Sequence, residues 1–170
     1  ISAIGKDALG DEILQELDKI KLSYFIERVD YPTGTVLVQL KEGIPNYTII
    51  ENVAWDYIPA TDEVKQLARR TDAICFGTLA QRSAVSRSTI HEILSLVPQS
   101  AYRILDINIR QHFYSKQIIE ESLRLCNVFK MNDDELELLR ELCPLEGCDE
   151  DAACRWFLNH FDLKVVILTA

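Results

Sequence analysis

The hydrophobic pattern of the chain changes near Pro59. Beyond this proline, short apolar runs alternate with segments whose apolar residues recur every three or four positions. The first pattern is typical of buried strands and the second of amphipathic helices. Their alternation predicts βαβ units and an α/β fold with a mostly parallel sheet covered on both faces. The expected strands are 73–76, 103–107, 127–131 and 164–170, and the expected helices are 61–70, 86–96, 115–125, 133–142 and 149–161.

Before Pro59 the pattern predicts one helix, over 7–20, and then three short strands. The strand segments are rich in β-branched and aromatic residues, and only turns separate them. The turns are expected at Pro32-Thr33-Gly34 and at Lys41-Glu42-Gly43. We therefore expect an antiparallel meander that lies outside the parallel sheet, with strands at 24–29, 35–40 and 47–50.

Polar residues follow the ends of the predicted parallel strands. Right-handed crossovers bring the carboxyl ends of these strands to one edge, and ligands of open α/β sheets bind at that edge. We therefore expect a single site built from segments far apart in the sequence, namely Gly77-Thr78, Asp106 to Arg110, Asn132 to Glu135, and Thr169.

The sequence Asn132-Asp133-Asp134-Glu135 has two interpretations. Asn is a favoured helix N-cap, and a Glu three residues later completes a capping box. Alternatively, Asn132 and Glu135 orient Mg²⁺, directly or through water, because this cation keeps most of its waters and needs few protein oxygens. The two roles are compatible.

The segment Asp106-Ile107-Asn108-Ile109-Arg110 also has two interpretations. If it is extended, its three polar side chains lie on one side. Arg110 then pairs with Asp106, or it recognises phosphate or sugar oxygens with its planar fork of donors.

Composition narrows the classes of partner. Net charge is -9, from 27 acidic and 18 basic residues, so nucleic acid and anionic membranes are not expected partners. No apolar stretch approaches the roughly 18 residues of a membrane span, and no basic-then-apolar stretch marks secretion, so we expect neither a membrane span nor export. Five cysteines without paired-ligand spacing suit free thiols in a reducing cytoplasm better than disulfides or zinc.

Both ends of the chain read as strands. Residues 1–5 resemble the end of a strand, and the strand at 164–170 reaches the last residue. We therefore expect the chain to be an internal piece of a longer protein.

Five motifs in order resemble the carbohydrate kinases of the ribokinase, or PfkB, family, and the resemblance extends over the whole chain. The motifs are Ile4 to Gly10, Pro32 to Thr35, Asp106 to Arg110, the N-x-x-E of Asn132 to Glu135, and the strand Val165 to Thr169. Ala54-Trp55-Asp56 and Arg110 to Tyr114 are most similar to fructokinase-type members.

This resemblance implies a three-layer α/β/α ribokinase-like domain, formed by residues 1–23 and 54–170, and a small β-sheet lid at 24–53. The lid implies a homodimer joined through it. The cofactors implied are ATP and Mg²⁺. The implied roles are metal binding for Glu135 and Asn132, nucleotide or phosphate binding for Asn108, Asn132 and Thr169, and sugar binding for Val36, Val38 and Arg110.

The resemblance also implies phosphorylation of a small sugar, with fructose as the first candidate. Ribose, a keto-deoxy sugar acid or a nucleoside are alternatives, as is a non-catalytic sugar- or nucleotide-binding module. The family's catalytic base and anion hole would follow Ala170, so we expect these 170 residues alone to be inactive.

Overall fold

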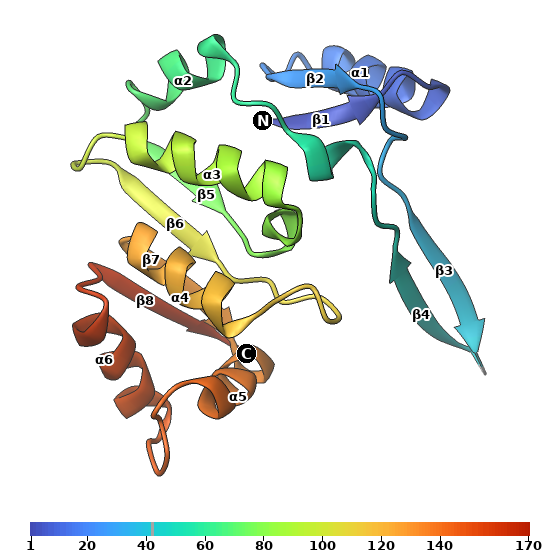
Figure 1. The fold of residues 1–170 in the computed structure, drawn as a ribbon. Helices are drawn as coiled ribbons and strands as arrows, with labels where there is room; N and C mark the ends of the chain where they lie inside the picture. Colours follow the sequence, from blue (N-terminus) through green and yellow to red (C-terminus); the bar gives the residue numbers. More distant parts are fainter. Residues whose placement is uncertain (42) are drawn as a thin grey trace.

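The computed structural model describes residues 1–41 and 43–170 and contains a four-stranded parallel sheet (Figure 1). Its strands are adjacent in chain order, and every neighbouring pair is parallel. This confirms the parallel sheet that the alternating pattern predicted. The strands are β5 (Ala73–Phe76), β6 (Tyr102–Asp106), β7 (Val128–Asn132) and β8 (Val165–Thr169).

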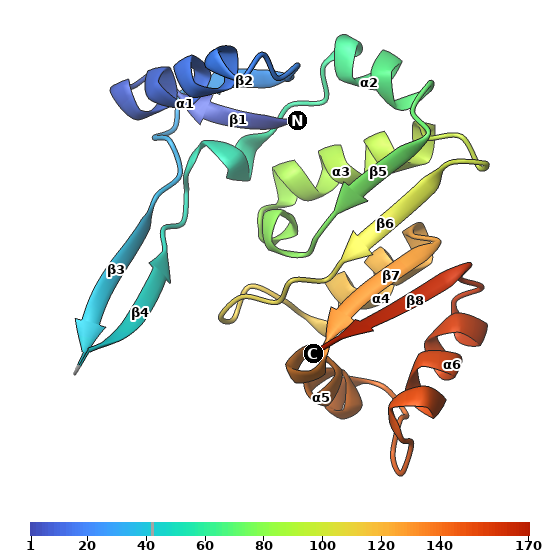
Figure 2. The ribbon, with the colours of Figure 1, turned by 180° about the vertical axis from the view of Figure 1, so that it is seen from behind.

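The helices that connect these strands lie on one face of the sheet. Viewed from behind, the strands lie in front of α3 and α4 (Figure 2). Right-handed crossovers between strands that are always added on the same side place every connecting helix on the same face. The four helices are α3 (Ala84–Leu96), α4 (Lys116–Leu125), α5 (Asp133–Leu142) and α6 (Glu150–His160).

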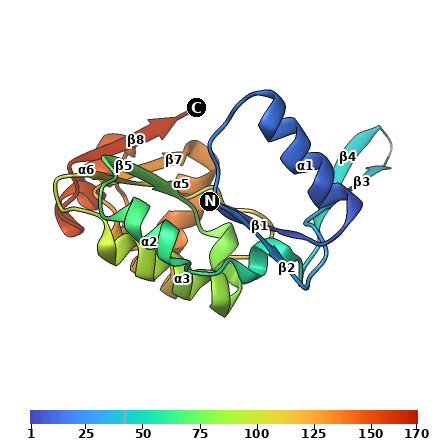
Figure 3. The ribbon, with the colours of Figure 1, turned by 90° about the horizontal axis from the view of Figure 1, so that it is seen from above.

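The other side of the strand layer carries α1 (Ala8–Lys19), opposite α2 (Asp62–Ala68) and α3 (Figure 3). Within the described residues this side carries α1 alone, which packs on the strand at residues 2–5, so the predicted cover on both faces is not seen for the four-stranded sheet. None of these helices is long and apolar enough to cross a membrane.

The main core lies between the middle of the sheet and helices α4 to α6. Leu105 and Phe129 are neighbours on β6 and β7, and Phe129 meets the ring of Phe157 from α6 at 5.2 Å between centroids. All three side chains are fully buried. Each such residue contributes roughly 1.5–3 kcal/mol relative to an exposed position. This core fixes the strands whose ends carry the polar residues.

The predicted three-stranded meander is wrong in its first strand. Strand β2 (Ile26–Val29) pairs in parallel with β1 (Ser2–Gly5), with α1 as the crossover between them. The antiparallel part is the hairpin of β3 (Val36–Lys41) and β4 (Ile44–Ile49). The predicted turn at residues 41–43 includes Glu42, which lies outside the described residues.

The reason for this difference lies at Thr33, in the segment predicted as a tight turn. Asp7, the N-cap of α1, accepts hydrogen bonds from Thr33 N at 2.8 Å, Thr33 Oγ1 at 2.6 Å and Gly10 N at 2.9 Å. Thr33 Oγ1 accepts in turn from Gly5 N at 2.9 Å. Residues 32–34 are therefore tied to the end of β1 and cannot fold β2 back onto β3.

We predict that Asp7→Asn destabilises the protein in a pH-dependent way. The hydrogen bonds from Thr33 and Gly10 lower the pKa of the Asp7 carboxyl below its ordinary value. A lowered folded pKa gives stability that is present above about pH 4 and is lost as the pH falls through the folded value. The urea midpoint of the variant should therefore be lower at pH 7, and the difference should shrink below about pH 4.

Asp30→Asn is the matched control, because Asp30 pairs with Lys6 in an exposed ion pair. Exposed pairs contribute little, so its midpoint should follow that of the unaltered chain at every pH. A difference between Asp7→Asn and the unaltered chain that stayed constant from pH 7 to pH 3 would contradict the prediction.

Candidate functional site

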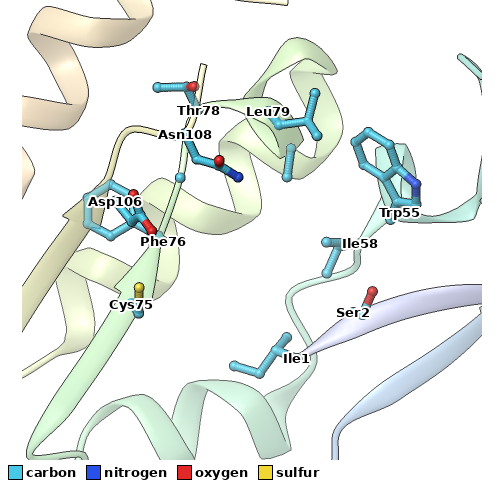
Figure 4. Close-up of a pocket in the computed structure, with 12 residues that line it drawn as sticks. Ile1, Ser2, Trp55, Ile58, Cys75, Phe76, Thr78, Leu79, Asp106 and Asn108 are labelled. Carbon is cyan, nitrogen blue, oxygen red and sulfur yellow. The ribbon is translucent and has the colours of Figure 1, made fainter. Parts of the chain in front are cut away.

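The carboxyl ends of β5 and β6 border a cavity of about 440 Å³ (Figure 4). Trp55 and Ile58 lie on one side of it together with the first two residues of the chain, and the ends of the two strands lie on the other. The lining is mainly apolar, with a few polar groups at the strand ends, as is usual for small-molecule sites. The residues are Ile1, Ser2, Trp55, Ile58, Cys75, Phe76, Gly77, Thr78, Leu79, Ala80, Asp106 and Asn108.

The loop at residues 107–114, called the edge loop here, bends sharply after β6. Asn108 and Gln111 both have positive φ, at 44° and 49°. Asn tolerates this left-handed conformation better than most residues. The expectation that Asp106, Asn108 and Arg110 share one side of an extended segment is therefore wrong, although Asp106 and Asn108 both line the cavity.

Asp106 pairs with Lys130 rather than with Arg110. Lys130 Nζ lies 3.2 Å from Asp106 Oδ1, an oxygen that is buried and receives no well-aligned hydrogen bond. Arg110 is exposed, its Nη1 donates to Ile109 O at 2.9 Å, and it forms no ion pair within the described part of the chain. Arg110 therefore leaves a positive charge available at this edge.

Glu135 joins the ends of β6 and β7. Its Oε1 accepts from Ile109 N and its Oε2 from Asn132 N, both at 2.9 Å, and the residue is only 6% exposed. Asn132 Oδ1 accepts from Glu135 N at 2.8 Å, so the predicted capping box is present. The carboxylate thus fixes the edge loop against the N-terminus of α5.

Thr169 lies beside Asn132 at the same edge. The two residues are register partners on β8 and β7. Thr169 is exposed and Asn132 is half-buried. Of the predicted phosphate ligands, the fold therefore places Asn132 and Thr169 side by side, and it places Asn108 on the edge loop that Glu135 holds.

Val36 and Val38 lie on the exposed hairpin and do not line the cavity. They share one face of it with their partners Ile49 and Tyr47. The hairpin contacts the edge loop where Gln111 Nε2 donates to Tyr47 O at 2.6 Å. This apolar face is therefore joined to the edge loop through Tyr47, the partner of Val38.

A directly ligated metal does not suit this arrangement, because both carboxylate oxygens of Glu135 already accept backbone N–H groups. The described residues contain no cluster of three acidic, histidine or cysteine side chains that could hold an ion. A cation that keeps its own waters still fits, because it needs only one or two protein oxygens in total.

Several residues near the site make contacts that the sequence did not indicate, although Thr78 was expected at this edge. Thr78 is fully buried, and its hydroxyl donates to Ile107 O at 2.7 Å. Gln81, also buried, donates to Gly77 O at 2.9 Å and contacts the half-buried His91. The sequence signal for Thr78 was its place at the end of a predicted strand. The signal for Trp55, which lines the cavity, was the motif Ala54-Trp55-Asp56.

The thiols take no part in this site, apart from Cys75 at the cavity wall. All five cysteines are free, as expected. Burial raises the pKa of the Cys126 thiol to about 12, which keeps it protonated and unreactive.

All 170 residues match the sequence model described as pfkB family carbohydrate kinase. The chain belongs to this family. An uncharacterized sugar kinase from Pyrococcus horikoshii is 24% identical over 144 residues, which cover 80% of this chain and 46% of that protein. The chain therefore spans about half the length of the curated relative that it matches.

Solved structures of fructokinases share the fold. Fructokinase from Xylella fastidiosa with bound ATP has a TM-score of 0.80 at 15% identity, covering 100% of this chain and 54% of that one. Fructokinase from Vibrio cholerae O395 in its fructose, ADP and calcium form has a TM-score of 0.75 at 17% identity, covering 100% and 56%. These likenesses confirm the mostly parallel α/β fold with a small antiparallel sheet.

We predict that Glu135→Gln loosens the edge loop. Gln keeps one acceptor oxygen but turns an amide NH₂ towards a backbone N–H, which leaves that buried donor without a partner. The expected loss is roughly 1–3 kcal/mol in the free energy of unfolding, measured by urea denaturation. Glu137→Gln serves as the control, because the Glu137 side chain is 71% exposed. Equal losses in the two variants would show that the Glu135 contacts contribute nothing specific.

Proposed function

We propose that the full-length protein transfers the γ-phosphoryl group of ATP to a hydroxyl of a small sugar, with fructose as the first candidate. The observation that carries this proposal is the convergence at one sheet edge. Three strand ends bring Asn108, Asn132 and Thr169 around the buried Glu135, in a chain that matches the family over its whole length.

The nucleotide phosphates are proposed to lie at Asn108, Asn132 and Thr169, with Arg110 supplying positive charge. A net charge of -9 makes local positive charge important for binding an anionic ligand. When bound, Mg²⁺ would neutralise charge on the phosphates. Asn132 and Glu135 are proposed to orient it through its waters, since the oxygens of Glu135 are engaged with the backbone.

The hairpin is proposed to act as a lid over the sugar. We assign the lid to residues 24–53, with β3 and β4 as its mobile part and Val36 and Val38 against the apolar side of the sugar. Closure would exclude water, so that ATP is not simply hydrolysed. The exposed apolar face of the hairpin supports this role.

The hairpin is also proposed to join two copies of the chain in a homodimer. Its exposed apolar side chains are the surface that we expect a second copy to cover.

The catalytic base is proposed to lie outside these 170 residues. Asp106 is the carboxylate that lines the described cavity, and it already pairs with Lys130. Phosphoryl transfer depends on positioning and on stabilisation of charge at the reacting centre. The present residues are proposed to hold phosphate and sugar while other residues activate the attacking hydroxyl.

The direct test is ADP release by the full-length protein with ATP, Mg²⁺ and a panel of sugars. Fructose is expected to stimulate release most strongly, and Glu135→Gln is expected to lower kcat by about 10–100-fold, as for other residues that orient metal-bound groups. Glu137→Gln is the matched control and should retain full activity. Absence of stimulation by every sugar would refute the kinase proposal.

The same panel separates fructose from the alternative substrates. A keto-deoxy sugar acid carries a carboxylate that Arg110 could bind through two parallel hydrogen bonds. If the sugar acid is the substrate, Arg110→Gln should raise its KM more than it raises the KM for a neutral sugar. Preference for ribose or a nucleoside would overturn the assignment of fructose while leaving kinase activity intact.

We also predict that the 170-residue chain alone gives no sugar-dependent ADP release. The measurement is the same assay on the purified chain, after its folded state has been checked by circular dichroism. Turnover at the rate of the full-length protein would contradict the placement of the base outside these residues.

A further inference from the structure

Arg82 connects elements that are distant in the sequence. It ends the 3₁₀ helix η2 (Leu79–Arg82), and its side chain is 7% exposed. Its Nε and Nη2 donate to Asp56 Oδ1 and Oδ2, both at 2.8 Å, and the Asp56 side chain is 5% exposed. Nη2 also donates to Ile50 O at 2.7 Å, immediately after β4. The guanidinium therefore holds the returning strand of the hairpin.

Two aromatic rings enclose the same guanidinium. Its carbon lies 4.0 Å from the ring centroid of Trp55 and 4.5 Å from that of Phe113. Trp55 belongs to the 3₁₀ helix η1 (Ala54–Tyr57), whereas Phe113 belongs to the edge loop. Arg stacks on aromatic rings and pairs with a carboxylate in the same plane, which a Lys ammonium cannot do.

The outgoing strand of the hairpin reaches Arg82 through Trp55. A Cβ added at Gly34 would lie 2.2 Å from Trp55 Nε1, so the ring packs directly on the backbone that leads into β3. Both ends of the hairpin therefore meet at one ion pair, and Phe113 joins the edge loop to it. The hydrogen bond from Gln111 to Tyr47 is a second link between the same two segments.

We propose that Arg82 is a positioning residue that sets the hairpin relative to the edge loop. It holds Ile50 and Trp55 on the hairpin side and Phe113 on the loop side. The functional part of this proposal rests on the proposed kinase activity, in which the edge loop binds phosphate and the hairpin covers the sugar. The coupling itself depends only on the contacts.

Arg82→Lys is the informative variant, because it keeps the charge opposite Asp56 but loses the paired hydrogen bonds and the stacking. Arg87→Lys is its matched control. Arg87 pairs with Glu121 between α3 and α4, so the same substitution there changes a more exposed Arg–carboxylate contact that touches neither the hairpin nor the edge loop.

Hydrogen exchange of the full-length protein tests the coupling without reference to activity. Arg82→Lys should accelerate amide exchange by about tenfold or more in both residues 36–49 and residues 108–113, because the two segments open together. Arg87→Lys should leave both at the unaltered rate. Phe113→Leu removes one stacked ring but keeps the ion pair, and should accelerate both by about two- to fivefold. Unaltered exchange of the hairpin in Arg82→Lys and Phe113→Leu would overturn the proposal.

Kinetics then test the positioning role. Arg82→Lys should raise the KM for the sugar by at least about tenfold while changing the KM for ATP much less. The reason is that a small displacement of the hairpin weakens its contacts with the bound sugar. Faster exchange with an unchanged sugar KM would overturn this role. If the unaltered protein phosphorylates no sugar, the proposed function fails, and the exchange result alone decides whether Arg82 couples the two segments.

Discussion

The site depends on one buried carboxylate that accepts two backbone N–H groups. Glu135 receives Ile109 N from the edge loop and Asn132 N from the start of α5, so a single side chain closes two strand ends against each other. A hydrogen bond from a neutral donor to a charged acceptor is stronger than one between neutral groups. The positions of Asn108 and Asn132 relative to each other follow from this contact.

A second buried charge organises the other border of the site in a similar way. Arg82 contacts the end of the hairpin, η1 and the edge loop, just as Glu135 contacts the edge loop and the start of α5. In both cases the charged group is engaged in holding the backbone and its neighbours. The groups left for a ligand are the polar ends of the strands and Arg110. This division explains why the most buried charged residues are not the ones expected to touch a substrate.

The parallel sheet was predictable because its signals are local. Apolar periodicity marks each strand and helix, and the N-x-x-E spacing marks the start of α5. The partner of β2 was not predictable in this way, since the choice between β1 and β3 depends on the distant contact of Asp7 with Thr33. The prediction of an extended segment over residues 106–110 was wrong for another reason. It continued the strand pattern through Asn108, but the positive φ of Asn108 ends the strand before that point.

The pairing of Arg82 with Asp56 left no sequence signal either. The residues are 26 positions apart, and nothing in the local pattern of either segment indicates the other. The candidate ligands at strand ends were found because the topology of parallel sheets places them together. The residues that fix their geometry were missed, since such contacts are decided by packing between elements.

The strand order β5-β6-β7-β8 has a consequence for how the chain acquires its structure. Each strand pairs with the one synthesised just before it, so the sheet can grow during translation without waiting for a later segment. Contacts between neighbours in sequence favour rapid folding. The contacts of Glu135 form once β7 and the start of α5 have joined, and the binding edge is complete only when β8 adds Thr169 afterwards.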